Sequence, residues 1–290
     1  MVNIHAAHES YFVILIIHKG VEVSNTLKLT GIQLSTPHVL DILEKQLHLP
    51  WVEVNSENYF IEGGRDLLNL EKIRSHYPIS LHGNGLSLGS ADELNWQYLK
   101  KLRQLILHIE PALVSDHLAW TSLHGHYFHN LLPLPFCENV IQHIVNRIRQ
   151  VEDYLKMPIL IENIPYYYSF QESEMTEYEF IKQIALQAGC GIVLNMHHLL
   201  ISSQHLNFNP QTYLINLPSH LIQEIHLPIF LTTDLIDLYR HTILHAGVKP
   251  TIIEPINENN SFPSISDLYL AACQAEKLMR ATYAVRKLTG

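Results

Sequence analysis

Short apolar runs rich in β-branched residues recur along the chain, and a longer segment with Leu, Ile or Val three or four positions apart follows most of them. The short runs predict buried strands and the longer segments predict amphipathic helices. Such alternation is typical of a parallel sheet built from strand-helix units. The runs that predict strands are eight, at residues 29–34, 51–54, 79–81, 112–115, 158–161, 191–194, 222–225 and 250–253.

The segments between these runs predict helices at residues 39–47, 94–108, 139–154, 176–188, 235–245 and 265–288. Thr176 with Glu179 resembles a capping box that opens one of them. Neither a linker rich in Gly, Pro or Ser nor a further internal repeat divides the chain. We therefore expect an α/β fold, a (β/α)8 TIM barrel over residues 29–290, with a short N-terminal extension at residues 1–28.

The extension contains one apolar run, from Tyr11 to Ile17, which predicts an extra strand. This run is too short to span the roughly 30 Å of bilayer hydrocarbon. It also lacks the basic start and small-residue cleavage site of a signal peptide. We expect no association with a membrane.

Composition narrows the class of protein. With 290 residues, 47% of them hydrophobic and 16% charged, the chain can bury a large core. A net charge of -9, with 19 Lys and Arg that form no run, argues against a nucleic-acid partner. Cys137, Cys190 and Cys273 are scattered and form no C-x-x-C pair, which favours a reducing compartment. We expect a cytoplasmic protein.

Polar residues stand at the carboxyl-terminal end of every predicted strand, where the active site of a TIM barrel is built. They are His38, Glu57, His82, Asp116 with His117, Glu162, Asn195 with His197 and His198, His226, and Glu254. A single such residue is more often a hydrogen-bonded loop anchor than a ligand, but eight strand ends together favour a metal site. Imidazole with carboxylate suits iron, zinc or manganese better than calcium or magnesium.

Other enzyme chemistries find less support, because the chain has no P-loop or H-E-x-x-H motif, and no G-x-G-x-x-G after a strand. His124, His126 and His129 follow the fourth predicted strand with alternating spacing, which predicts an exposed hairpin rather than a second metal site. The run from Tyr166 to Tyr168 fits a packed loop and a rim for a peptide or ring-bearing ligand equally well.

Several motifs, in order, resemble the multinuclear non-heme iron-dependent oxidative enzymes, also known as domain of unknown function 692. They are WVEV and ENY within 51–59, SLHG and LSLG within 80–89, SDHLAW at 115–120, IEN at 161–163, GCG at 189–191 and EIHL at 224–227. The resemblance runs from about residue 29 to residue 270. It implies a barrel whose mouth holds two or three iron ions and which, with a small partner protein, oxidises cysteines or other residues of a short peptide, as the methanobactin-forming oxidase does.

The same resemblance implies that His82, His117, Glu162 and His226 ligate iron, and Glu254 matches an acidic residue that ends the last strand. Departures from the family pattern reduce the number of carboxylates. They are Asn195 in place of Asp, His197 and His198 in place of two asparagines, the absence of a ligand-bearing loop after His226, and Pro255-Ile256 in place of Trp-Asp. These changes imply a site with one or two metal ions, to which Asn195 and His198 also belong.

Three functions agree with these features. The first is a metal-dependent oxidoreductase acting on a peptide or thiol, with iron as the cofactor and zinc or manganese as alternatives. The second is a catalytically degenerate barrel that binds a metal or a peptide. The third is a metal-dependent isomerase-like barrel, which requires more carboxylates than the strand ends supply.

Overall fold

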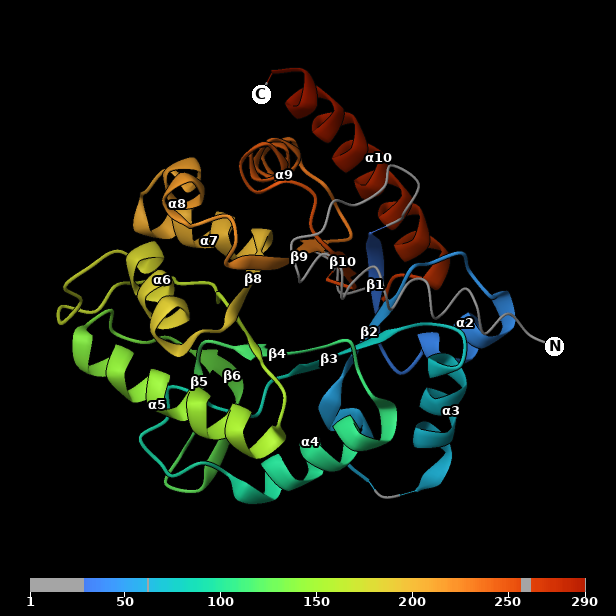
Figure 1. The fold of residues 1–290 in the computed structure, drawn as a ribbon, viewed down its shortest axis with the longest axis horizontal. Coiled ribbons are helices and arrows are strands. Elements are labelled where there is room, and N and C mark those ends of the chain that lie inside the picture. Colours follow the sequence, from blue (N-terminus) through green and yellow to red (C-terminus); the bar gives the residue numbers. More distant parts are fainter. Residues whose placement is uncertain (1–28, 62, 257–261, 290) are drawn as a thin grey trace.

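The computed structural model describes residues 29–61, 63–256 and 262–289 (Figure 1). The predicted strand at residues 11–17 lies outside the described residues. Eight parallel strands close into a barrel in the order β1-β10-β9-β8-β7-β4-β3-β2. They are β1 (Thr30–Leu34), β2 (Val52–Asn55), β3 (Ile79–Gly83), β4 (Leu113–His117), β7 (Leu160–Glu162), β8 (Gly191–Asn195), β9 (Ile222–Pro228) and β10 (Thr251–Glu254). The predicted TIM barrel is confirmed.

Helices surround the barrel (Figure 1). They are α2 (His38–Lys45), the 3-10 helix η1 (Ser56–Tyr59), α3 (Gly64–Arg74), α4 (Trp96–Ile109), α5 (Glu138–Leu155), α6 (Glu177–Ala188), α7 (Met196–Leu206), α8 (Pro210–Asn216), α9 (Thr233–Ala246) and α10 (Ile265–Thr289). The six predicted helices form within two residues of the expected bounds, and Thr176 and Glu179 make the predicted capping box. Helices α3, α7 and α8 were not expected. None of the helices in the described ranges is long and apolar enough to cross a membrane.

Most strands extend beyond the ends expected from sequence, by one to three residues. Most of the expected ends lay directly before a polar residue, yet the backbone ladder continues through polar positions because its hydrogen bonds do not depend on the side chain. His82 pairs with Asn55 and Ser115 on the neighbouring strands, and His226 pairs with Asn195. The candidate ligands His82 and His226 therefore belong to rigid strands instead of loops.

The side chains inside the barrel change from apolar to polar along the strands. At its amino-terminal end it holds a compact apolar cluster of Trp51, Leu113, Leu160, Val193 and Ile252. Towards the carboxyl-terminal end the inward positions become polar, because alternate strand residues point to the same side. The apolar cluster closes the amino-terminal end of the barrel, and the polar side chains that could bind a ligand or a metal lie at the carboxyl-terminal end.

A two-stranded antiparallel hairpin stands outside the barrel after β4. It consists of β5 (Trp120–Leu123) and β6 (His126–Leu132). Most of β6, including His126 and His129, is exposed to solvent. The expectation of an exposed hairpin at these histidines is confirmed.

Candidate metal centre

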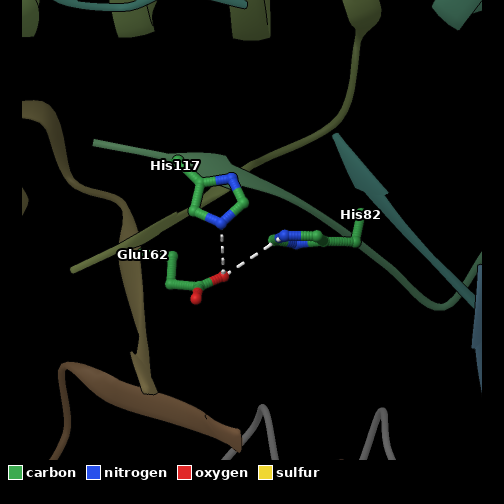
Figure 2. A group of neighbouring side chains, drawn as sticks. All are labelled: His82, His117 and Glu162. Atoms are coloured by element: carbon green, nitrogen blue, oxygen red, sulfur yellow. Dashed lines mark ion pairs between the residues drawn. The ribbon is translucent and has the colours of Figure 1, made fainter. Parts of the chain in front are cut away.

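Three imidazole rings converge on one carboxylate oxygen, Oε2 of Glu162, at the end of β7. His82 Nε2 lies 3.3 Å from this oxygen and His117 Nε2 lies 3.7 Å from it (Figure 2). His226 Nδ1 lies 3.6 Å away. Glu162 is fully buried, and within the described chain its Oε2 has no hydrogen-bond partner. A buried acceptor of this kind is costly unless a cation or a proton neutralises it.

The other nitrogen of each ring is held by a neighbouring group. His82 Nδ1 lies 2.8 Å from Ser115 Oγ, and His117 Nδ1 lies 3.2 Å from the carbonyl oxygen of Gly83. A carbonyl can only accept, so His117 donates from Nδ1 and presents the lone pair of Nε2 to Glu162. Histidines that ligate metals are usually oriented in this way.

A second carboxylate completes the cluster. Glu254 Oε1, at the end of β10, lies 3.3 Å from His226 Nδ1. Ligand atoms lie within 4.8 Å of one another in the set His82, His117, Glu162 and again in the set Glu162, His226, Glu254. The two sets share Glu162, so its carboxylate could bridge two ions. The donors, imidazole nitrogen and carboxylate oxygen, fit a transition metal.

The ionisation of the cluster follows from its neighbours. Burial lowers the pKa of His117 to about 4, so this ring is neutral at pH 7. Burial alone would raise the pKa of Glu162, but His117, His226 and His82 outweigh it and the pKa falls well below the usual range. The pKa of His226 is raised well above its usual range, because Glu53 and Glu162 outweigh burial. Metal binding would therefore displace a proton from His226.

Asn195 is oriented by the helix that follows it. Its Oδ1 accepts from the backbone N–H groups of His197 and His198, which caps α7. Its Nδ2 donates to Glu162 Oε1 and to Glu254 Oε2, each at 2.9 Å. Because an amide nitrogen cannot accept from the backbone N–H groups, the capping contacts fix this orientation. Asn195 holds the two carboxylates together, and its role as a ligand stays a prediction.

The remaining predicted histidines are divided between the cluster and the surrounding structure. His198 borders the cluster, with Nδ1 3.4 Å from Glu162 Oε1 and 2.9 Å from the carbonyl of Asn163. His197 packs edge-on against Phe230, with ring centroids 5.5 Å apart. The structure thus brings one of this pair to the cluster.

His38 does not reach the cluster. It is buried at the start of α2, where Nδ1 accepts from the backbone N–H of Ser35 and Nε2 donates to the carbonyl of Pro263. Both ring nitrogens are used to anchor the loop after β1. His38 therefore serves as a hydrogen-bonded loop anchor, the more common role of a single histidine at a strand end.

The predicted acids Asp116 and Glu57 lie beside His117. Asp116 accepts from the backbone N–H groups of His117 and Leu86. Burial and the neighbouring Glu57 raise the pKa of Asp116 to about 7. Glu57 Oε1 accepts from Tyr98 Oη at 2.7 Å. These acids form an outer group next to the three-imidazole cluster.

Two acids that sequence analysis did not select, Glu53 and Glu224, stand deeper in the barrel, and both are fully buried. Glu224 Oε1 lies 3.2 Å from His226 Nε2, and Glu53 Oε1 lies 3.6 Å from the same atom. Glu53 also accepts from Ser80 Oγ. A charged residue inside an apolar strand was the available signal, since Glu224 and His226 are two positions apart and face the same side.

A cavity of about 380 Å³ opens at the carboxyl-terminal face of the barrel, between the ends of β2 and β3 and the hairpin. Its walls include Glu57, Asn84, Tyr127 and His129. Tyr127 Oη donates to the carbonyl of Asn84, two residues after His82, which ties the hairpin to β3. The volume falls in the range of small-ligand sites.

A closed parallel barrel with buried His and Glu groups at its carboxyl-terminal mouth defines a TIM barrel with a candidate metal centre. The family model of the RiPP precursor modification enzymes MbnB/TglH/ChrH matches residues 29–280, and the chain belongs to this family. The resemblance inferred from the motifs is confirmed.

Relatives and solved structures agree with this assignment. A UPF0276 protein of Acaryochloris marina is 41% identical over 260 residues, 85% of this chain and 93% of that protein. A UPF0276 protein of Vibrio vulnificus is 34% identical over 270 residues, 87% and 92% of the two chains. The structure of an L-ribulose 3-epimerase matches with a TM-score of 0.66 and 11% identity, over 91% of this chain and 98% of that chain. At this identity the likeness shows the fold alone.

Proposed function

We propose that this chain is a metal-dependent oxidoreductase that modifies a peptide or thiol substrate, with iron as the metal. The observation that carries the proposal is the convergence of His82, His117 and His226 on Oε2 of Glu162, which has no hydrogen-bond partner among the residues that the structure describes. Two ligand sets that share Glu162 support a site for one or two ions. Zinc and manganese suit the same donors.

In this proposal the ligands are His82, His117, Glu162, His226 and Glu254. Bound iron would supply electrons to dioxygen and open coordination positions for a substrate sulfur. His117 enters as a neutral ligand because burial holds its pKa near 4.

His226 would release a proton on binding an ion through Nδ1. Glu224 Oε1, 3.2 Å from Nε2, would hold the ring by accepting a hydrogen bond from the other nitrogen. The apolar cluster beneath the site keeps water away from the interior of the barrel.

A peptide substrate is supported by the family, whose description names RiPP precursors, that is, peptides made on the ribosome and then modified. The cavity of about 380 Å³ between β2, β3 and the hairpin could take part of a peptide, and polar groups such as Glu57 and Tyr127 line it. A small partner protein that delivers the peptide remains part of the proposal, as does a cytoplasmic location.

Elemental analysis of anaerobically purified protein tests the metal. We expect one or two iron ions per chain. A variant that combines Glu162→Ala with His226→Ala should lose them. A matched control replaces Glu71 and His108, an exposed pair joined at 2.6 Å, with alanine. The control should retain its iron.

Oxygen uptake with cysteine-containing peptides tests the reaction. An iron-loaded protein that takes up no oxygen with any thiol or precursor peptide would contradict the oxidoreductase. Absence of metal from the native chain would instead support a degenerate barrel that binds a peptide. The isomerase-like alternative gains no support beyond the fold that this chain shares with the L-ribulose 3-epimerase.

A further inference from the structure

A second cavity, of about 360 Å³, lies between the start of α6, the segment joining α7 to α8, and the loop before α5. None of its lining residues belongs to the metal centre. Phe136, Tyr178, Phe208 and Tyr213 contribute aromatic rings to the walls, and Glu177 contributes a carboxylate. The loops before α5 and α6 follow strand ends, so they belong to the face that carries the metal centre.

The carboxylate of Glu177 is only partly satisfied. The residue is 5% exposed, and its Oε1 accepts from Tyr213 Oη at 3.3 Å. Its Oε2 is buried and has no partner among the residues that the structure describes. A buried carboxylate without a cation is unfavourable, so this carboxyl group is stabilised either by a proton or by a cation supplied from outside.

The walls of the cavity suit a positive charge. Tyr213 stacks on Phe208 and meets Tyr178 edge-on, with ring centroids 6.1 and 6.0 Å apart. The faces of such rings attract cations. Lys182 already approaches the Tyr178 ring, with Nζ 5.9 Å from the centroid, but it does not line the cavity.

The residues around Glu177 do not neutralise it. Burial raises its pKa to about 8, and the hydrogen bond from Tyr213 offsets only part of this effect. The titratable groups that face it are Tyr213 of α8 and Tyr166 of the loop after β7, and burial raises both of their pKa values well above 10. Both tyrosines stay neutral and supply no positive charge.

We propose that this cavity binds an organic cation, an ammonium or guanidinium group on an apolar stem, with Glu177 as its counter-ion. The stem would lie among the aromatic rings and the charged end would meet the carboxyl group of Glu177. Two sources share this chemistry, a free amine and a Lys or Arg side chain of a bound peptide. The cation site does not depend on the proposed oxidation.

Titration calorimetry on the full chain tests the site with two cationic probes, 2-phenylethylamine and N-acetyl-lysine methylamide. Their neutral counterparts are 2-phenylethanol and N-acetyl-norleucine methylamide. We expect at least one cation to bind at least tenfold more tightly than its neutral counterpart. Preference for the amine would indicate a free metabolite, and preference for the lysine derivative would indicate a peptide side chain.

In the variant Glu177→Gln the ratio of cation to neutral-probe affinity should fall at least tenfold. In Glu179→Gln, a change two residues further along α6 at a partly exposed position, this ratio should stay the same. Below pH 8 the affinity of the native chain should fall up to tenfold per pH unit, because protons compete for Glu177, and Glu177→Gln should lack this dependence. If Glu177→Gln unfolds, Phe208→Leu provides the second test and should weaken the cations more than the neutral probes. Equal binding of cations and neutral probes, or no binding of either cation, would overturn the proposal.

Discussion

Two buried glutamates show how differently one residue type can behave in the same molecule. Glu162 in the barrel mouth and Glu177 at the start of α6 are 0% and 5% exposed, and each has one oxygen without a partner among the described residues. Yet the pKa of Glu162 falls well below the usual range, whereas burial raises that of Glu177 to about 8. The difference lies in the neighbours, which are imidazoles around Glu162 and a phenol beside Glu177.

The comparison teaches that burial favours a protonated carboxyl group and that nearby cations can reverse this preference. The barrel mouth keeps Glu162 ionised before any metal arrives. Glu177, in the cavity at the start of α6, would be ionised by a cation that binds from outside. Four substitutions test this distinction, in order of the expected effect.

Glu162→Gln should abolish most of the stabilisation that a bound metal gives to the fold. A ligand present at about a thousand times its Kd adds roughly 4 kcal/mol to the free energy of unfolding. We expect that gain for the native chain with ferrous iron and little of it for the variant. Anaerobic denaturant unfolding with iron and with a chelator measures both values. Equal gains in the two proteins would remove Glu162 from the metal site.

Glu177→Gln should change how stability depends on pH. The carboxyl pKa is about 8 in the fold against 4.5 for an ordinary glutamate, so the stabilisation is complete below pH 4.5 and is lost as pH rises towards 8. Within this window the native chain should lose about 1.4 kcal/mol per pH unit relative to the variant. Urea unfolding at pH 5, 6, 7 and 8 gives the difference. A constant difference would mean that burial does not raise this pKa.

Glu224→Leu should lower metal affinity about ten- to a hundredfold, the usual cost of losing an outer partner of a ligating histidine. The change removes the acceptor 3.2 Å from His226 Nε2. Glu224→Gln, whose amide oxygen can still accept, should lose less. Competition with a fluorescent chelator measures the affinities. Gln223→Leu, on the other side of β9, is the control, and an equal loss there would indicate a general effect on the strand.

Glu179→Ala should cost about 1 kcal/mol, through the loss of the capping box with Thr176. Glu179, which is partly exposed, supplies a third environment, because backbone and side-chain hydrogen bonds from Thr176 lower its pKa. The variant should leave metal binding and the pH dependence between pH 5 and 8 unchanged. Thermal unfolding and elemental analysis check both points, and a loss of metal here would contradict the separation of the two regions.

Much of the fold could be predicted, because strand and helix periods are local properties of the chain. The eight strands, six of the helices and the cap at Thr176 are all found. Helix α3 was missed because many polar residues weaken its periodicity, and α7 because its first residues were considered only as site residues. The polar strand ends could be predicted because parallel strands bring their ends to one face of the barrel, and the family resemblance selected His82, His117, Glu162 and His226 among them.

The sequence by itself determined the barrel, the family and the set of polar strand ends. Only the tertiary structure decided which of them meet at one oxygen, that His38 serves as an anchor, and that Asn195 directs its amide N–H groups at two carboxylates. The tertiary structure also showed that three further acids, Glu53, Glu224 and Glu177, are buried. The reason is physical: burial, hydrogen-bond direction and pKa depend on neighbours from distant parts of the chain, and no local pattern encodes those neighbours.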